Sequence, residues 1–514
     1  MIRSKSIVMK RILACALAAA SLLAAAPIKP KLVLAIVIDQ FRYDYLTRFR
    51  SEYHAGLERL LTRGAVFTNA RYEHFPTVTA VGHSTFLSGA TPALSGIIAN
   101  EWYDREEGKT VTSVSDSATK LLGGSGAGAG SSPHRLLVDT VGDELKMADE
   151  NTSRAIGISL KDRAAILPAG HMANGAYWFD AKSGNFVSST YYFAELPAWV
   201  QDFNSGRPAD QYRGANWLSK AMPSERAALY AAIDASPFAN EMIERLAEIA
   251  IQAEQLGQRD VTDLLAVSFS ANDYVGHAAG PDSPEVHDMA VQTDRVLEKL
   301  FDAVDEKVGL DNVIVVLTGD HGVAPLPEVN TQRKMPGGRL PLGIVSKTVQ
   351  AALVKKYGDG KWIVSNADQS IYLDWDLIAR KNLSVKDVDD AAADAAAAIP
   401  HVFRVYSREQ LIGGAALPDP VARRVMNGYY ARRGADVEVL LEPYWIFPQT
   451  GATHGAPFGY DTHVPVIFMG PGIRAGRYDN AIAVNDIAPT LATMLDVETP
   501  SGSVGRVLTE MLGQ

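Results

Sequence analysis

Short runs of apolar residues recur along the chain and alternate with segments of helical periodicity. A run that is apolar throughout predicts a strand buried on both faces, as in a parallel sheet covered by helices. The predicted strands span residues 32–38, 155–160, 264–269, 313–317 and 464–469, and the clearest helices span 136–147, 239–253 and 285–308. This order indicates an α/β fold with a largely parallel central sheet and helices on both faces.

The remaining segments predict how this domain is elaborated. Residues 27–514 form one α/β domain in this interpretation, with insertions at about 167–215 and about 325–450 that cover one end of the core. The first insertion contains an aromatic hairpin. A Gly/Ser/Ala stretch at 123–132 offers few side chains for packing and predicts a mobile surface loop.

The N-terminus predicts export to the periplasm. A basic start is followed by an apolar run from Ile12 to Ala26, which is typical of a signal peptide over residues 1–26 and short for a membrane span. The alternative is an uncleaved anchor helix. Cys15 is the only cysteine, so after signal removal any metal must be held by His, Asp and Glu.

The net charge of −10 narrows the possible partners. An anionic surface disfavours binding to nucleic acid or to acidic membranes, although a local cationic pocket still attracts phosphate. We therefore expect small-molecule substrates, no nucleic-acid partner and no stable membrane anchor once the signal is removed. The sequence does not indicate an oligomeric state.

Polar residues that can bind metal follow several of the predicted strands. Ligand sites in parallel sheets lie just outside the carboxyl ends of the strands. One such Asp alone is often only a turn residue or a helix cap, but six carboxylate and imidazole side chains beside strand ends or glycine turns match the needs of two zinc ions. They are Asp39, Asp273, His277, Asp320, His321 and His454.

A hydroxyl nucleophile is predicted in the segment Phe75-Pro-Thr-Val-Thr79. A threonine hydroxyl is a weak nucleophile unless a metal stabilises its alkoxide, and a helix that begins at Thr79 would direct backbone N–H groups at an anion. The alternative is that Thr79 only caps a helix. His83, one turn further on, is expected to be a core or turn histidine, and a residue that supports the metal ligands is the alternative.

These residues together resemble the alkaline phosphatase superfamily, in particular its threonine-type periplasmic phosphatases. The resemblance implies that Asp39, Thr79, Asp320 and His321 hold one zinc ion. It assigns the second zinc ion to Asp273, His277 and His454. It also implies that Asn100, Lys161 and Arg163 bind the phosphoryl oxygens, since a Lys-x-Arg pair distinguishes the monoesterases of this superfamily from its diesterases.

The predicted activity is the hydrolysis of phosphate monoesters through a phosphothreonine at Thr79. The nearest alternative is a phosphodiesterase or nucleotide pyrophosphatase that uses the same two-metal site. A periplasmic protein that binds phosphate or zinc without turnover is the alternative from another class. A sulfatase would need a Cys or Ser nucleophile in another sequence context.

Overall fold

The computed structural model describes residues 29–126, 128–365, 367–414 and 419–513. The predicted signal peptide at 1–26 lies outside the described residues. Within them, no helix combines the length and apolar character needed to span a bilayer.

An eleven-stranded mixed sheet forms the centre of the molecule, in the order β20-β2-β19-β13-β1-β12-β7-β8-β9-β5-β6. Strands β13, β1, β12, β7 and β8 are mutually parallel, whereas β19 runs antiparallel to β13 and β2. The strands are β1 Leu32–Ile38, β2 Ala65–Arg71, β5 Ser115–Leu122, β6 Ala129–Ser131, β7 Ala155–Ser159, β8 Gly175–Asp180, β9 Asn185–Ser189, β12 Asp263–Phe269, β13 Val313–Thr318, β19 Val466–Met469 and β20 Gly476–Ala483.

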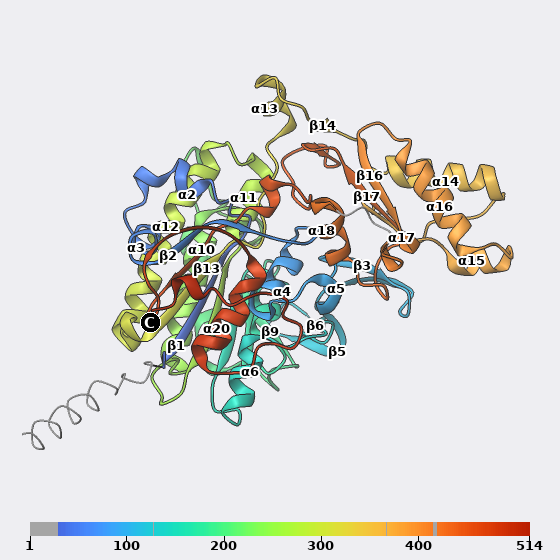
Figure 1. Ribbon diagram of the computed structural model, residues 1–514. Helices are drawn as coiled ribbons and strands as arrows, with labels where there is room; N and C mark the ends of the chain where they lie inside the picture. The colour runs from blue at the N-terminus through green and yellow to red at the C-terminus, as the bar shows by residue number, and fades with distance from the viewer. Residues whose placement is uncertain (1–28, 127, 366, 415–418, 514) are drawn as a thin grey trace, which may run out of the picture.

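Helices cover both faces of this sheet, as predicted (Figure 1). Leu32, Leu34 and Ile36 of β1 pack with one cluster of helices, and the alternate residues Val33 and Ala35 pack with the other. The first cluster contains α3 Gly56–Arg63, α10 Pro237–Ala253 and α12 Pro284–Val308, and the second contains α4 Thr79–Ser88, α6 Val141–Ala148 and α20 Ile487–Leu495. Burial of each large aliphatic side chain contributes about 1.5–3 kcal/mol, so β1 anchors both layers.

The structure corrects two predictions for the region after residue 120. Part of the stretch 123–132 is not a loop, because Ala129–Ser131 form β6 and pair with β5 at the sheet edge. The aromatic hairpin is present as β8 and β9, but β8 pairs with β7. These strands therefore extend the central sheet rather than cover its end, since a glycine-rich or aromatic composition carries no information about strand partners.

The segment from about 325 to 450 has a sheet and an apolar core of its own, which we call the cap (Figure 1). Its three-stranded sheet, in the order β15-β17-β16, packs on helices and stands beside the main domain. The elements are α13 Pro327–Gln332, α14 Ile344–Tyr357, β15 Ser370–Ile371, α15 Trp375–Arg380, α16 Val385–Ala397, β16 Val402–Ser407, α17 Arg408–Ile412, α18 Pro420–Gly428 and β17 Val437–Leu441. The chain then returns to the main sheet through the loop that carries His454.

Candidate active site

Three buried side chains meet where β1 and β13 end. Asp39 follows β1, and Asp320 and His321 follow β13, its parallel neighbour. The Nε2 atom of His321 lies 3.5 Å from Oδ1 of Asp39 and 3.4 Å from Oδ2 of Asp320. We call this set the strand-end group. Its three ligand atoms all lie within 4.8 Å of one another, which is the arrangement that one metal ion requires.

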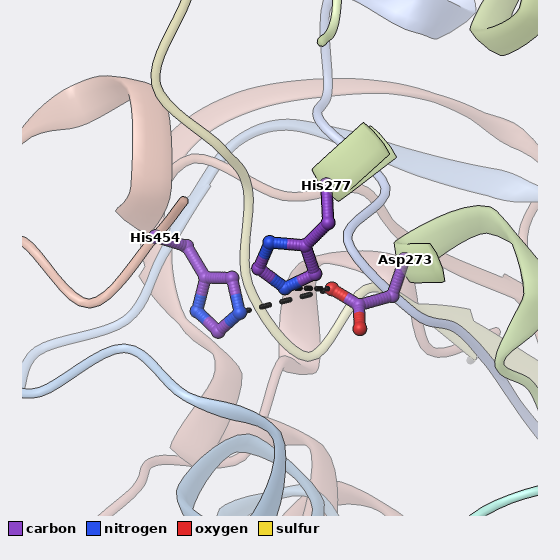
Figure 2. A group of neighbouring side chains, drawn as sticks. All are labelled: Asp273, His277 and His454. Atoms are coloured by element: carbon purple, nitrogen blue, oxygen red, sulfur yellow. Dashed lines mark ion pairs between the residues drawn. The ribbon is translucent and has the colours of Figure 1, made fainter. Parts of the chain in front are cut away.

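A second set of three side chains also gathers at one point (Figure 2). Asp273 and His277 project from α11, Ala271–Ala279, and His454 comes from the loop that follows the cap. Oδ1 of Asp273 lies 3.2 Å from Nε2 of His277 and 3.7 Å from Nε2 of His454. We call this set the helix group. The helical turn between Asp273 and His277 places both on one face, as the spacing of four residues predicted.

The three histidines are held in one orientation and present the same ring nitrogen. In each, Nδ1 donates to a main-chain carbonyl oxygen, so Nδ1 carries a proton and Nε2 faces a neighbouring carboxylate. The contacts are His277 to Ala452 at 2.8 Å, His321 to Gly322 at 2.9 Å and His454 to Thr77 at 2.8 Å. The rings of His321 and His454 also stack, with centroids 3.5 Å apart, which links the two groups.

Burial determines the charges at this site. It lowers the pKa of His321 to about 3 and that of His454 well below its usual value, so both imidazoles are neutral, as metal binding requires. Burial and the neighbouring Asp39 raise the pKa of Asp320 well above its usual value. A nearby cation is therefore needed to stabilise the Asp320 carboxylate.

The strand-end group fits a divalent ion on a second observation. Oδ1 of Asp39, Oδ2 of Asp320 and Nε2 of His321 are buried and have no hydrogen-bond partner among the described residues. Buried polar atoms are rarely left unpaired, and these three converge on one point. A carboxylate and imidazole donor set suits zinc.

Thr79 is the first residue of α4, and its buried Oγ1 lies 3.5 Å from Nζ of Lys161. Gly82, in the next turn, allows α4 to approach the strand-end group, because a Cβ there would lie 2.2 Å from the backbone oxygen of Asp320. His83 contacts the carbonyl oxygen of Thr79 through Nδ1 and the hydroxyl of Ser268 on β12 through Nε2, both at 2.8 Å. His83 thereby fixes the start of α4 against the sheet.

Lys161 lies between the two groups. Its Nζ donates to Oδ2 of Asp39 and to Oδ2 of Asp273, both at 2.6 Å, and lies 3.5 Å from Oγ1 of Thr79. Burial opposes the positive charge, but the carboxylates of Asp273 and Asp39 outweigh it and raise the pKa of Lys161. The site therefore holds a fixed cation within reach of the threonine oxygen.

Asn100 and Arg163 differ from Lys161 in their surroundings. The side-chain oxygen of Asn100 accepts a hydrogen bond from the backbone N–H of Ala80 at 2.8 Å. The N–H of the residue after Thr79 therefore already has an acceptor within the protein. Lys161 and Arg163 do not share an extended segment, because α7, Asp162–Ala169, begins between them. Arg163 lies in its first turn with a side chain that is 26% exposed, and among the described residues its nearest carboxylate is Asp162, at 3.8 Å. It is therefore available to a ligand.

Two buried residues that the sequence did not predict also contact the ligand-bearing loops. Gln40 contacts Asp320 and Asp273, and Asp461 accepts a hydrogen bond from the N–H of Ala456 at 2.7 Å, two residues after His454. The position of Gln40 directly after Asp39 was a readable signal, whereas nothing in the local sequence distinguished Asp461. For His83 the sequence favoured a core or turn role over a supporting one, and the structure shows a fully buried side chain that contacts the carbonyl oxygen of Thr79.

Comparisons with known proteins show which chains and structures this protein is similar to. The profile of the type I phosphodiesterase / nucleotide pyrophosphatase family matches residues 33–456. The chain is 37% identical to alkaline phosphatase PafA of Elizabethkingia meningoseptica, over 95% of each chain. It is also 37% identical to alkaline phosphatase PhoV of Synechococcus elongatus, over 94% of this chain and 93% of that one. The crystal structure of PafA superposes with a TM-score of 0.89 at 36% identity and covers 95% of this chain and 100% of that chain.

Proposed function

The chain belongs to the type I phosphodiesterase / nucleotide pyrophosphatase family of the alkaline phosphatase superfamily, and we propose that it is a zinc-dependent phosphate monoesterase with Thr79 as its nucleophile. The observation that carries this proposal is the buried Lys161 ammonium, which stands between the two metal-binding groups and 3.5 Å from Oγ1 of Thr79. Relatives named as alkaline phosphatases over nearly the whole chain support an enzyme rather than a binding protein without turnover.

The metal ions are proposed to be two zinc ions, one in each group. When bound, they would stabilise the Thr79 alkoxide and the negative charge on the departing alcohol. The residues of the strand-end group and Thr79 would hold one ion, and the helix group would hold the other. Each group keeps room for further ligands because it offers only three side chains besides Thr79.

The chain's own residues then perform two displacements at phosphorus. Oγ1 of Thr79, after it loses its proton, forms a bond to phosphorus while the bond to the ester oxygen breaks, and the leaving oxygen takes up a proton as the alcohol departs. A water molecule next loses a proton and forms a bond to phosphorus while the bond to Thr79 breaks, so Oγ1 takes up a proton and inorganic phosphate is released. In each displacement the transition state is stabilised mainly by positioning and by charge.

Three side chains are proposed to bind the nonbridging oxygens of the phosphoryl group. Lys161 supplies a charge next to Thr79, and Arg163 supplies a planar fork from the start of α7. The amide of Asn100, fixed through its oxygen by the N–H of Ala80, presents its N–H₂ group. A monoester carries one more negative charge than a diester, so two cations favour the monoester.

A phosphodiesterase is the second candidate, since diesterases give the family its name. The deciding experiment compares p-nitrophenyl phosphate with bis-p-nitrophenyl phosphate in zinc buffer. We expect higher kcat/KM on the monoester, and higher kcat/KM on the diester would overturn the proposal.

The role of Thr79 has a direct test. Thr79→Ala should abolish turnover and the acid-stable phosphate label that brief exposure to substrate leaves on the protein. Thr85→Ala is the matched control, because Thr85 is buried in the same helix and its hydroxyl donates to the carbonyl of Ala90 at 3.0 Å. Retention of activity in Thr79→Ala would disprove the nucleophile.

Export to the periplasm is part of the proposal. It depends on the segment 1–26, where a basic start precedes a short apolar run. N-terminal sequencing of the protein from a periplasmic extract should show that this segment has been removed. Recovery of the full-length chain from the cytoplasm would contradict it.

A further inference from the structure

We propose that Gln40 is a positioning residue that joins the two metal-binding groups, and that its side chain controls the affinity of the helix group alone. Gln40 is 2% exposed, directly follows Asp39, and contacts one carboxylate of each group. The inference rests on the proposed function only in so far as the two groups bind metal.

The backbone and the side chain of Gln40 serve different groups. The backbone N–H donates to Oδ1 of Asp320 at 2.9 Å, in the strand-end group. The side-chain Nε2 donates to Oδ1 of Asp273 at 2.6 Å, in the helix group. Oδ1 is also the oxygen of Asp273 that lies nearest to Nε2 of both His277 and His454. The amide therefore orients the oxygen that faces the two imidazoles.

Two backbone features that cost stability, one at Gln40 and one at Gly276, make room for this amide. Gln40 adopts φ of 60°, in the left-handed region that residues with a Cβ seldom occupy. In α11, Gly276 stands next to His277, and a Cβ on it would lie 1.8 Å from Oε1 of Gln40. Glycine inside a helix is less favourable than alanine. Both features place the amide against α11 with its N–H₂ group towards Asp273.

Hydrogen bonds to metal-ligating carboxylates fix the direction of their lone pairs, and their loss costs about 10- to 100-fold in metal affinity. Substitution of Gln40 removes the side-chain bond to Asp273 and keeps the backbone bond to Asp320. The structure therefore predicts an asymmetric effect, in which one of two ions is weakened.

The test counts zinc bound per chain. Metal-free wild-type protein and Gln40→Met are equilibrated with a series of buffered free zinc concentrations, and bound zinc is measured by elemental analysis. Methionine has a similar length and no donor. We expect two ions in the wild type, and in Gln40→Met one step of unchanged affinity and one weakened by about 10- to 100-fold.

A second variant displaces the Gln40 amide by adding a methyl group on α11, the helix against which the amide packs. Gly276→Ala leaves Gln40 in place and displaces its amide, so it should weaken the same single step. Gln350→Met is the matched control, since its amide bonds Gly360 and Trp362 in the cap at 2.8 and 2.9 Å. Two unchanged steps in both Gln40→Met and Gly276→Ala, or equal weakening of both steps, would overturn the inference. A wild-type protein that binds no zinc would instead refute the proposed function.

Discussion

Substitution of Lys161 by alanine should separate the two ester classes. Nζ of Lys161 lies 3.5 Å from Oγ1 of Thr79, so a phosphoryl oxygen on that atom comes within its hydrogen-bonding range. Two unit charges about 4 Å apart interact by about 4 kcal/mol at an effective dielectric constant of about 20. Removal of one donor that stabilises developing charge costs about 100- to 1,000-fold in kcat.

We therefore expect Lys161→Ala to lower kcat/KM for p-nitrophenyl phosphate by about 100-fold or more, and for bis-p-nitrophenyl phosphate by less than about 10-fold, because the diester lacks the extra charge. Bound zinc is measured in the same samples, since the ammonium also contacts Asp39 and Asp273. Lys146→Ala is the control: Lys146 is 2% exposed and donates to Asn174 at 2.6 Å. Equal losses on both esters at equal zinc content would refute the role of the charge.

Three further predictions concern stability. Chelation of the metal should lower Tm, and added zinc should restore it. Zinc at about 1,000 times its Kd stabilises the folded protein by about 4 kcal/mol, and its removal leaves the buried oxygens of Asp39 and Asp320 without a counter-charge. An unchanged Tm after chelation would contradict the metal site. Burial raises the pKa of Asp389 from its usual 3.8 to about 8, and neither of its carboxylate oxygens has a hydrogen-bond partner among the described residues. The folded protein therefore favours the protonated carboxyl, and the stability that this form contributes is lost as the pH rises from about 3.8 to about 8. Asp389→Asn should therefore raise the free energy of urea unfolding by about 1–3 kcal/mol above pH 8 and leave it unchanged at low pH, and a uniform effect would exclude ionisation as the cause. Gly82→Ala should lower both Tm and zinc content, whereas Gly126→Ala, where an added Cβ has nothing within 4 Å, should not.

The pattern of apolar runs predicted the centre of the fold, because a strand that is buried on both faces consists of apolar residues throughout. The run at 32–38 is β1 residue for residue, and the helix expected at 285–308 is α12 with one more residue at its start. The residues of a buried strand do not indicate its direction, so the antiparallel pairing of β19 with β13 could not be predicted. The helix expected from 136 begins at Val141, where Thr140 and Asp143 form a capping box that the sequence already contained.

The metal-binding groups could be predicted from the sequence for a different reason. Each ligand follows a strand or lies near a glycine turn, and the fold brings these ends to one edge of the sheet. The contacts of Gln40 with Asp320 and Asp273 join segments far apart in the chain, so sequence spacing alone does not predict them. Asp461 contacts Ala456, five residues away, but nothing in the local sequence distinguishes it from other aspartates. The expectation that Lys161 and Arg163 share an extended segment required knowledge of where α7 begins.

His454 is supplied by the chain only after the whole cap, which has a consequence for biosynthesis. The strand-end group is complete once His321 has been synthesised, whereas the helix group waits for about 130 more residues. The ligand set of the helix group is therefore incomplete until the whole cap has been synthesised. A chain that stops within the cap lacks His454 and with it one of the three side chains of that group.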